Sequence, residues 1–314
     1  MKGLRAGWSG ARFILVACLL LSACASPATR TGNAPAQPIR VLAVETFLSD
    51  IAQSVAGNRL RVEALMPVGL DPHAFEPAPS DVVKISQSQV LIVNGAGLEE
   101  WLQRLLDNAG GQRLVIVASQ GLTMRVPPPG DPAAVEHPEG DPHFWLDPTK
   151  VVRYVENIRD GLSQADPAGA GTYANNAQAY VAQLNDLDQW ITAQVSQVPP
   201  ARRLLVTNHE TFGYFADRYG FKIVGAIVPS VTSNASPSAQ EMATLVNRVR
   251  AAGAPAVFLE VGANTQLANQ LASETGIRVV TGLLTHSVSA AGGPAPTYIE
   301  MMRYNTTAIV TALK

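Results

Sequence analysis

The stretch 172-TYANNAQAYVAQLNDLDQWITAQVSQV-198 decides how the rest of the chain is organised. Its apolar residues recur at spacings of three, four and seven, which predicts one long amphipathic helix that ends at Pro199-Pro200. Such a helix covers about 40 Å at about 1.5 Å per residue. We expect it to be a rigid strut, with an N-terminal lobe at 39–168, a linker at 169–198 and a C-terminal lobe at 199–314.

Short β-rich runs alternate with helical patterns on both sides of this stretch, which is typical of parallel sheets. The runs expected to be strands are Arg40–Glu45, Arg61–Met66, Gln89–Asn94, Leu114–Ala118, Arg203–Thr207, Lys222–Val228, Ala256–Val261 and Ile277–Thr281. A further helix is expected to begin at Asp147-Pro148 and to run to about Gln164. The predicted fold class is therefore α/β, with two lobes that each hold a mostly parallel four-stranded sheet flanked by helices and are joined by one long helix.

Length and composition limit the possible classes of protein. The chain has 314 residues, of which 47% are hydrophobic and 15% charged, which is enough apolar material for a large core. Lysine and arginine number 23 against 25 acidic residues, for a formal net charge of −2. This balance lacks the basic footprint of a nucleic-acid-binding protein. We expect a monomer that binds no nucleic acid.

The N-terminus has the pattern of a targeting segment. Positive residues precede the apolar run Phe13–Leu21, which is too short to span a bilayer. The run ends in Leu21-Ser22-Ala23-Cys24, which resembles a bacterial lipobox. We therefore expect a signal peptide at 1–23, lipidation of Cys24 and a solvated tether at 24–38 that holds a globular domain outside the membrane. The alternative is an ordinary signal peptide with an incidental cysteine.

The histidines carry the main functional signal. Four of the five, namely His73, His143, His209 and His286, are placed where a strand is expected to have just ended. The tripeptide Asp-Pro-His occurs at both His73 and His143, and its proline stiffens the turn that presents the ring. Because ligands gather at the carboxyl ends of strands in open α/β sheets, two facing lobes would direct four imidazoles into one cleft. His137 is expected to be at most a weak, mobile contact.

Imidazole is the commonest nitrogen ligand of Zn²⁺, so this cluster predicts a zinc site. One alternative is a zinc hydrolase with three histidines and a metal-bound water, although the chain has no His-Glu-x-x-His motif. The other is a binding protein for an organic solute, in which the histidines are incidental. A fourth protein ligand would close the site to substrate, so His286 distinguishes a metal-binding protein from an enzyme, and we expect no enzymatic activity.

Taken together, several motifs resemble the zinc- or manganese-binding solute-binding proteins of bacterial ABC transporters, sometimes called solute-binding protein family nine. They are the lipobox, Gly69–His73 with Phe75–Pro77, Asp141–His143 with Trp145–Pro148, Asn208-His209 with Phe212–Phe215, and Gly293–Tyr298. The resemblance implies two α/β lobes joined by a long helix, and one metal site between them. It also implies delivery of the ion to a membrane permease driven by a separate ATPase.

The same resemblance assigns three imidazole ligands to His73, His143 and His209. The family's fourth ligand is usually an aspartate, and here that segment begins with His286. Four neutral imidazoles leave the charge of the ion uncompensated, so we expect a carboxylate behind them, with Glu260 and Glu210 as candidates. Either glutamate is also an alternative to His286 as a ligand. Nitrogen ligation favours Zn²⁺ over Mn²⁺ as the transported ion.

Overall fold

The computed structural model describes residues 39–126, 140–230, 233 and 236–314. Its strands are β1 (Val41–Ala43), β2 (Val62–Ala64), β3 (Val90–Val93), β4 (Leu114–Val117), β5 (Leu204–Thr207), β6 (Lys222–Ala226), β7 (Ala256–Glu260) and β8 (Arg278–Leu283). Each lies at one of the eight predicted runs. The expected signal peptide, Cys24, the tether and His137 lie outside the described residues.

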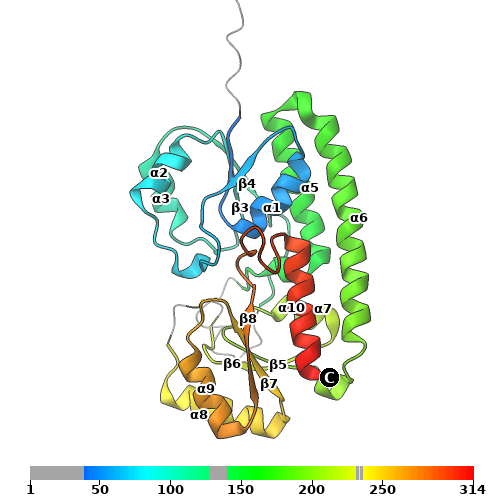
Figure 1. Ribbon diagram of the computed structural model, residues 1–314. Coiled ribbons are helices and arrows are strands. Elements are labelled where there is room, and N and C mark those ends of the chain that lie inside the picture. Colours follow the sequence, from blue (N-terminus) through cyan, green and yellow to red (C-terminus); the bar gives the residue numbers. More distant parts are fainter. Residues whose placement is uncertain (1–38, 127–139, 231–232, 234–235) are drawn as a thin grey trace, which may run out of the picture. The chain divides into compact units, whose positions relative to one another are not determined.

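The strands form two parallel sheets with the same plan. One has the order β2-β1-β3-β4 and the other the order β6-β5-β7-β8. Figure 1 labels β3 and β4 of the first sheet and all strands of the second. In both sheets the chain starts in an inner strand, adds its second strand on one side and its last two on the other. Every pairing is parallel, which requires a crossover connection between successive strands. The predicted fold class is confirmed.

Helices surround both sheets. They are α1 (Thr46–Ala56), α2 (Pro79–Ser86), α3 (Leu102–Ala109), α5 (Pro148–Ala165), α6 (Ala170–Val195), α7 (Gly213–Tyr219), α8 (Ala239–Ala252), α9 (Thr265–Thr275) and α10 (Tyr298–Leu313). Short 3₁₀ turns include η1 (Pro72–Ala74), η2 (Phe144–Leu146), η3 (Pro167–Gly169) and η4 (Pro200–Arg202). No helix among the described residues is long and apolar enough to cross a membrane.

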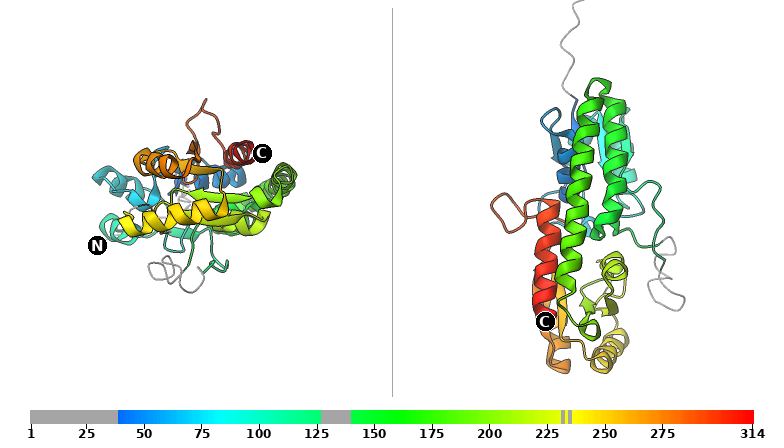
Figure 2. Two further views of the ribbon diagram at one scale, coloured as in Figure 1. Left: turned by 90° about the horizontal axis from the view of Figure 1, so that it is seen from below. Right: turned by 90° about the vertical axis from the view of Figure 1, so that its right-hand side faces the viewer.

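The predicted strut is α6, which has 26 residues. Its predicted apolar positions are buried: Tyr173, Ala177, Tyr180, Leu184, Leu187 and Ile191. The helix packs on α5, α1 and α10, and the right-hand view of Figure 2 shows it between α5 and α10. We call the residues before α6 the first half and those after it the second half. Because α6 touches elements of both, it supports the two sheets together.

The largest buried apolar cluster contains residues of both halves. It includes Phe47 and Trp145 from the first half, and Phe215, Phe258 and Leu313 from the second. Two smaller clusters fill the remaining faces, one for each sheet. The apolar interior is therefore continuous across the seam between the halves, as expected when burial of apolar area drives folding.

Polar contacts also cross this seam. The Tyr298 hydroxyl donates to the Trp145 carbonyl at 2.6 Å, and the Tyr298 backbone N–H donates to Asp50 at 2.8 Å. The Trp145 indole N–H donates to the carbonyl of Thr285 at 2.6 Å. Trp145 is fully buried and stacks on Phe47 with ring centroids 4.5 Å apart. These bonds satisfy polar groups that would be costly to bury without partners.

Candidate metal centre

The four predicted histidines come from four separate segments. His73 lies in η1 between β2 and α2, and His143 directly precedes η2. His209 follows β5 by two residues, and His286 follows β8 by three. The ends of both sheets therefore contribute to one place, as expected for parallel sheets whose carboxyl ends face each other.

His143 reaches this place by a different route from the one that the sequence suggests. The strand before it, β4, ends at Val117, far upstream. An isolated antiparallel bridge between Arg125 and Asp141 brings the chain back to the seam, two residues before His143. The expectation that a strand ends just before His143 is wrong, because β4, the strand that precedes it, ends at Val117.

The two Asp-Pro-His tripeptides form the same local turn. The backbone N–H of His73 donates to Asp71 Oδ1 at 2.9 Å, and that of His143 donates to Asp141 Oδ1 at 2.9 Å. This is the Asx-type bond that aspartate makes to a backbone two residues on, and the proline between them fixes its own φ. The repeated tripeptide thus sets the backbone of each histidine locally.

The four rings converge. One potential ligand atom from each of His73, His143, His209 and His286 lies within 4.8 Å of all the others. The His143 Nε2 atom is 3.2 Å from His73 Nε2 and 3.3 Å from His286 Nε2. Zn–N bonds of 2.0–2.1 Å in a tetrahedron would place neighbouring nitrogens about 3.3 Å apart. The spacing of these three nitrogens therefore matches a single ion held by imidazoles.

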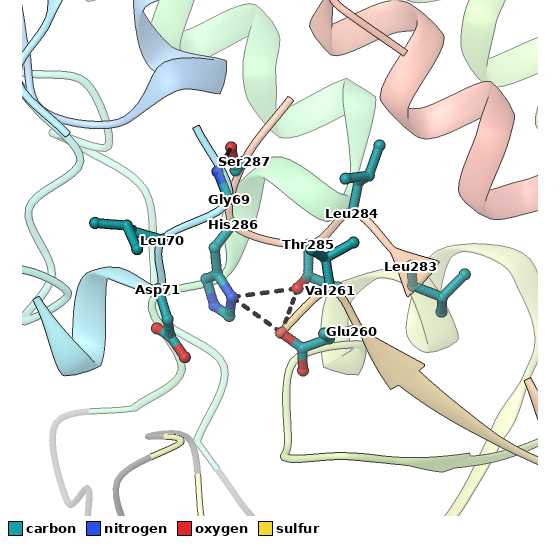
Figure 3. A pocket seen from close by; sticks show the side chains of 10 residues that line it. All are labelled: Gly69, Leu70, Asp71, Glu260, Val261, Leu283, Leu284, Thr285, His286 and Ser287. Atoms are coloured by element: carbon teal, nitrogen blue, oxygen red, sulfur yellow. Dashed lines mark hydrogen bonds and ion pairs between the residues drawn. The ribbon is translucent and has the colours of Figure 1, made fainter. Parts of the chain in front are cut away.

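Glu260 lies behind two of the rings. Its Oε1 atom is 2.6 Å from His209 Nδ1, and its Oε2 atom is 3.0 Å from His286 Nδ1. Figure 3 shows the second of these contacts, together with the hydroxyl of Thr285. A carboxylate that accepts from Nδ1–H fixes the tautomer and leaves Nε2 for a metal. Asp141 Oδ1 holds His143 Nδ1 in the same way at 2.8 Å.

Burial and charge prepare the rings for a cation. His143 and His209 are fully buried, and His286 is 6% exposed. Burial lowers the pKa of His73 to about 3 and holds that of His143 well below its ordinary value. Burial alone would raise the pKa of Glu260, but the neighbouring His209 and His286 hold it well below its ordinary value. The site therefore offers neutral imidazoles of the first half and a negative carboxylate of the second.

The two candidate glutamates have different positions. Glu260 contacts two of the rings, whereas the close group of possible ligands found among the described residues contains only the four histidines. Glu210 lines a cavity between α7, β6 and α8, and its backbone N–H donates to the Ser230 carbonyl at 2.9 Å. The structure thus brings together all four predicted histidines, with Glu260 directly behind them.

Sequence reasoning missed the position of Trp145. Its ring centroid is 5.1 Å from that of His143 and 5.8 Å from that of His286, so it packs against one ring of each half. It also missed Thr211, whose hydroxyl is 2.8 Å from His209 Nε2 and 3.1 Å from His209 Nδ1. Both residues lie two positions after a histidine. That proximity in sequence was the available signal, but it does not indicate which side chains turn toward the rings.

Known proteins resemble this chain over nearly its whole length. The family described as zinc-uptake complex component A, periplasmic, matches residues 41–312. The manganese-binding lipoprotein MntA of Halalkalibacterium halodurans is 34% identical over 96% of each chain. The iron-binding protein YfeA of Yersinia pestis is 31% identical over 94% of this chain and 92% of its own.

A solved structure extends the similarity to the fold. The periplasmic zinc-binding protein TroA of Treponema pallidum superposes with a TM-score of 0.79 at 26% identity, covering 88% of this chain and 99% of its own. Each of these proteins is named for the metal that it binds, so the hydrolase alternative is not favoured. The chain belongs to the zinc-uptake component A family, the metal-binding components of ABC transporters.

Proposed function

We propose that this protein captures Zn²⁺ between its two halves and delivers it to the permease of an ABC transporter, whose separate ATPase subunit drives uptake. The observation that carries the proposal is the set of four imidazoles whose ligand atoms lie within 4.8 Å of one another. The ion is the cargo of the protein. Residues 39–168 and 199–314 act as the two lobes that enclose it.

The donor set supports zinc among the possible ions. Four nitrogen ligands, with the contacts among three of them at tetrahedral spacing, suit Zn²⁺, whereas Mn²⁺ prefers carboxylate and water oxygens and a larger coordination number. Glu260 contacts the Nδ1 side of two rings, so the proposal places it behind the ligands, where it balances part of the ionic charge. The relatives named above are described as binding manganese, iron or zinc. The choice among these ions therefore rests on the ligands of this chain.

The location of the protein follows from its relatives and its N-terminus. The similar MntA is named a lipoprotein, and this chain has a lipobox-like sequence that ends at Cys24. We propose that a lipid on Cys24 holds the protein at the outer side of the membrane, as a monomer, beside the permease. A lipidated cysteine needs a second membrane contact for stable anchoring, unless it carries more than one acyl chain.

The direct test is metal competition on the full chain. Metal-free protein is equilibrated with Zn²⁺ and with an approximately 100-fold excess of Mn²⁺, and the bound metal is measured by elemental analysis. We expect one Zn²⁺ per chain and less than about a tenth of that amount of Mn²⁺, in keeping with the affinity order of nitrogen sites. Displacement of Zn²⁺ by equimolar Mn²⁺ would contradict the choice of zinc. Failure to retain any divalent metal would contradict the proposed function itself.

A further inference from the structure

Two cavities lie next to each other at the seam and lead to the histidines. The smaller cavity has a volume of about 20 Å³, and its lining includes His286. The larger cavity has a volume of about 650 Å³. Both are lined by the same five residues, which are Gly69, Leu70, Asp71, Glu260 and Val261. The shared residues form a passage from the wide cavity to the ring of His286.

The walls of this passage come from opposite halves. Leu70 belongs to the first half and is 43% exposed, and Val261 belongs to the second half and is 48% exposed. Other sides of the centre are covered, because His143, His209 and Trp145 are fully buried. His73 is the one ligand candidate that is only partly buried, and it lies on the same segment as Leu70. An ion therefore meets the least covered part of the centre from this side.

Two carboxylates line the passage on either side of the His286 ring, as the view in Figure 3 shows for Asp71 and Glu260. Glu260 is committed to two imidazole nitrogens. Asp71 touches its own turn through Oδ1, and its Oδ2 accepts a hydrogen bond from the hydroxyl of Ser233 in the second half. Asp71 thus contacts residues on both sides of the passage. Neither of these two contacts involves a ring nitrogen.

We infer that the metal ion enters and leaves between the segment Gly69–His73 and the segment Glu260–Val261, and that the carboxylate of Asp71 meets the ion first and passes it to the imidazoles. This inference rests on the proposed function. A negative charge at the mouth of a cleft attracts cations and raises their association rate. In this proposal the same carboxylate stays beside the ion inside the centre. It therefore stabilises the transition state for entry and the bound state to a similar extent. It is therefore a positioning residue whose main effect is on the rate of association.

The variant Asp71→Asn isolates the charge. Asparagine keeps the size of the side chain and the Oδ1 acceptor for the His73 backbone N–H, so the turn is preserved. Stopped-flow mixing of the metal-free full chain with Zn²⁺ can be followed by tryptophan fluorescence, since Trp145 packs against two of the rings. At low salt we expect association to slow by about tenfold, while dissociation into excess chelator changes by less than about threefold. Added salt should reduce the difference in association rate between the parent and Asp71→Asn.

Two further variants distinguish the role of Asp71 from general charge. Glu76→Gln removes an exposed carboxylate that lines the same wide cavity, and it should change the association rate by less than about twofold. Asp71→Glu keeps the charge and should retain most of the parental rate. The inference is overturned if Asp71→Asn binds Zn²⁺ at the parental rate, or if Glu76→Gln slows binding equally. Stoichiometric binding by the parent in the same experiment would leave the proposed function intact, whereas no binding by the parent would remove both.

Discussion

The two halves of the molecule share one strand order but support their histidines differently. In the first half, His73 and His143 each have an aspartate two residues earlier that holds the backbone of the ring residue. In the second half, His209 and His286 come from different strands and depend on the two oxygens of Glu260. The first arrangement is local and occurs twice, whereas the second is shared and occurs once.

This difference determines how many histidines a single substitution disturbs. Loss of one of these aspartates disturbs one histidine, because each aspartate holds only the histidine two residues after it. A shared carboxylate couples two rings, so its loss releases both and leaves two buried imidazoles without their partner. We therefore expect loss of a supporting carboxylate in the second half to displace more of the four rings than loss of one in the first half.

The largest expected effect comes from removing both rings of one half. The pair His73→Ala with His143→Ala, and separately the pair His209→Ala with His286→Ala, should each lower Zn²⁺ affinity by more than about 1,000-fold, because two of four ligands are lost. Equilibrium competition with a chelator measures the change, and circular dichroism confirms folding. Retention of Zn²⁺ near the parental affinity by the second pair would show that the centre needs only the first half.

A smaller effect directly tests the shared carboxylate. Glu260→Gln should lower Zn²⁺ affinity by about 100-fold, and Asp141→Asn by about tenfold, within the range measured for groups that orient metal ligands. The reason is that glutamine keeps one acceptor for two Nδ1–H donors, whereas Asp141 serves one ring. Chelator competition gives both values.

Glu241→Gln is the matched control in the second half. Glu241 caps α8 and is not among the residues that contact the rings, so its replacement should leave Zn²⁺ affinity unchanged within about twofold. If Asp141→Asn costs as much as Glu260→Gln, the contrast between local and shared support is wrong.

An effect on stability rather than on metal affinity concerns the seam itself, where Asp50 of the first half accepts from the backbone of Tyr298 in the second. Burial raises the pKa of Asp50 to about 6, above its ordinary value of 3.8. Its protonated form therefore favours folding: this contribution is full below about pH 4 and is lost as the pH rises through about 6. Between pH 4 and pH 7, titration of this carboxyl should lower the free energy of unfolding of the parent by about 2 kcal/mol. Asp50→Asn should abolish this part of the decrease.

Denaturant unfolding of the metal-free chain at several pH values measures this difference. Asp186→Asn, on an exposed position of α6, is the control and should follow the parental pH profile. If Asp50→Asn also follows the parental pH profile, burial at the seam does not raise the pKa of Asp50.

Much of the fold could be predicted because its signals are local. Short apolar runs indicate all eight strands, and the apolar spacing of α6 predicts its buried face. The helix ends at Val195, three residues earlier than predicted, because the N–H groups of Gln197 and Val198 donate to the carbonyls three residues before them, which tightens the turn ahead of Pro199. Four expected strands on each side of α6 predict two lobes of similar plan, but strand order is not a local property, so the orders β2-β1-β3-β4 and β6-β5-β7-β8 come from the structure alone.

The site was predictable in its ligand candidates and less so in its supports. Repeated Asp-Pro-His tripeptides mark two histidines, and the nearby strand ends mark the others. The sequence indicates two candidates for a carboxylate behind the rings, Glu260 at the end of its strand and Glu210 next to His209, and the contacts with two rings belong to Glu260. The contact of Trp145 with Thr285 depends on how the halves meet, and no spacing along the chain encodes it.

The apolar interior that runs through the seam has a consequence for dividing the molecule. A cut on either side of α6 would separate side chains that now form one buried cluster, and would give each fragment a broad water-exposed apolar face. Neither fragment would be a self-sufficient folding unit, and both would be prone to aggregate or to reassociate. Domain exchange between relatives would therefore need matched partners on both sides of the junction.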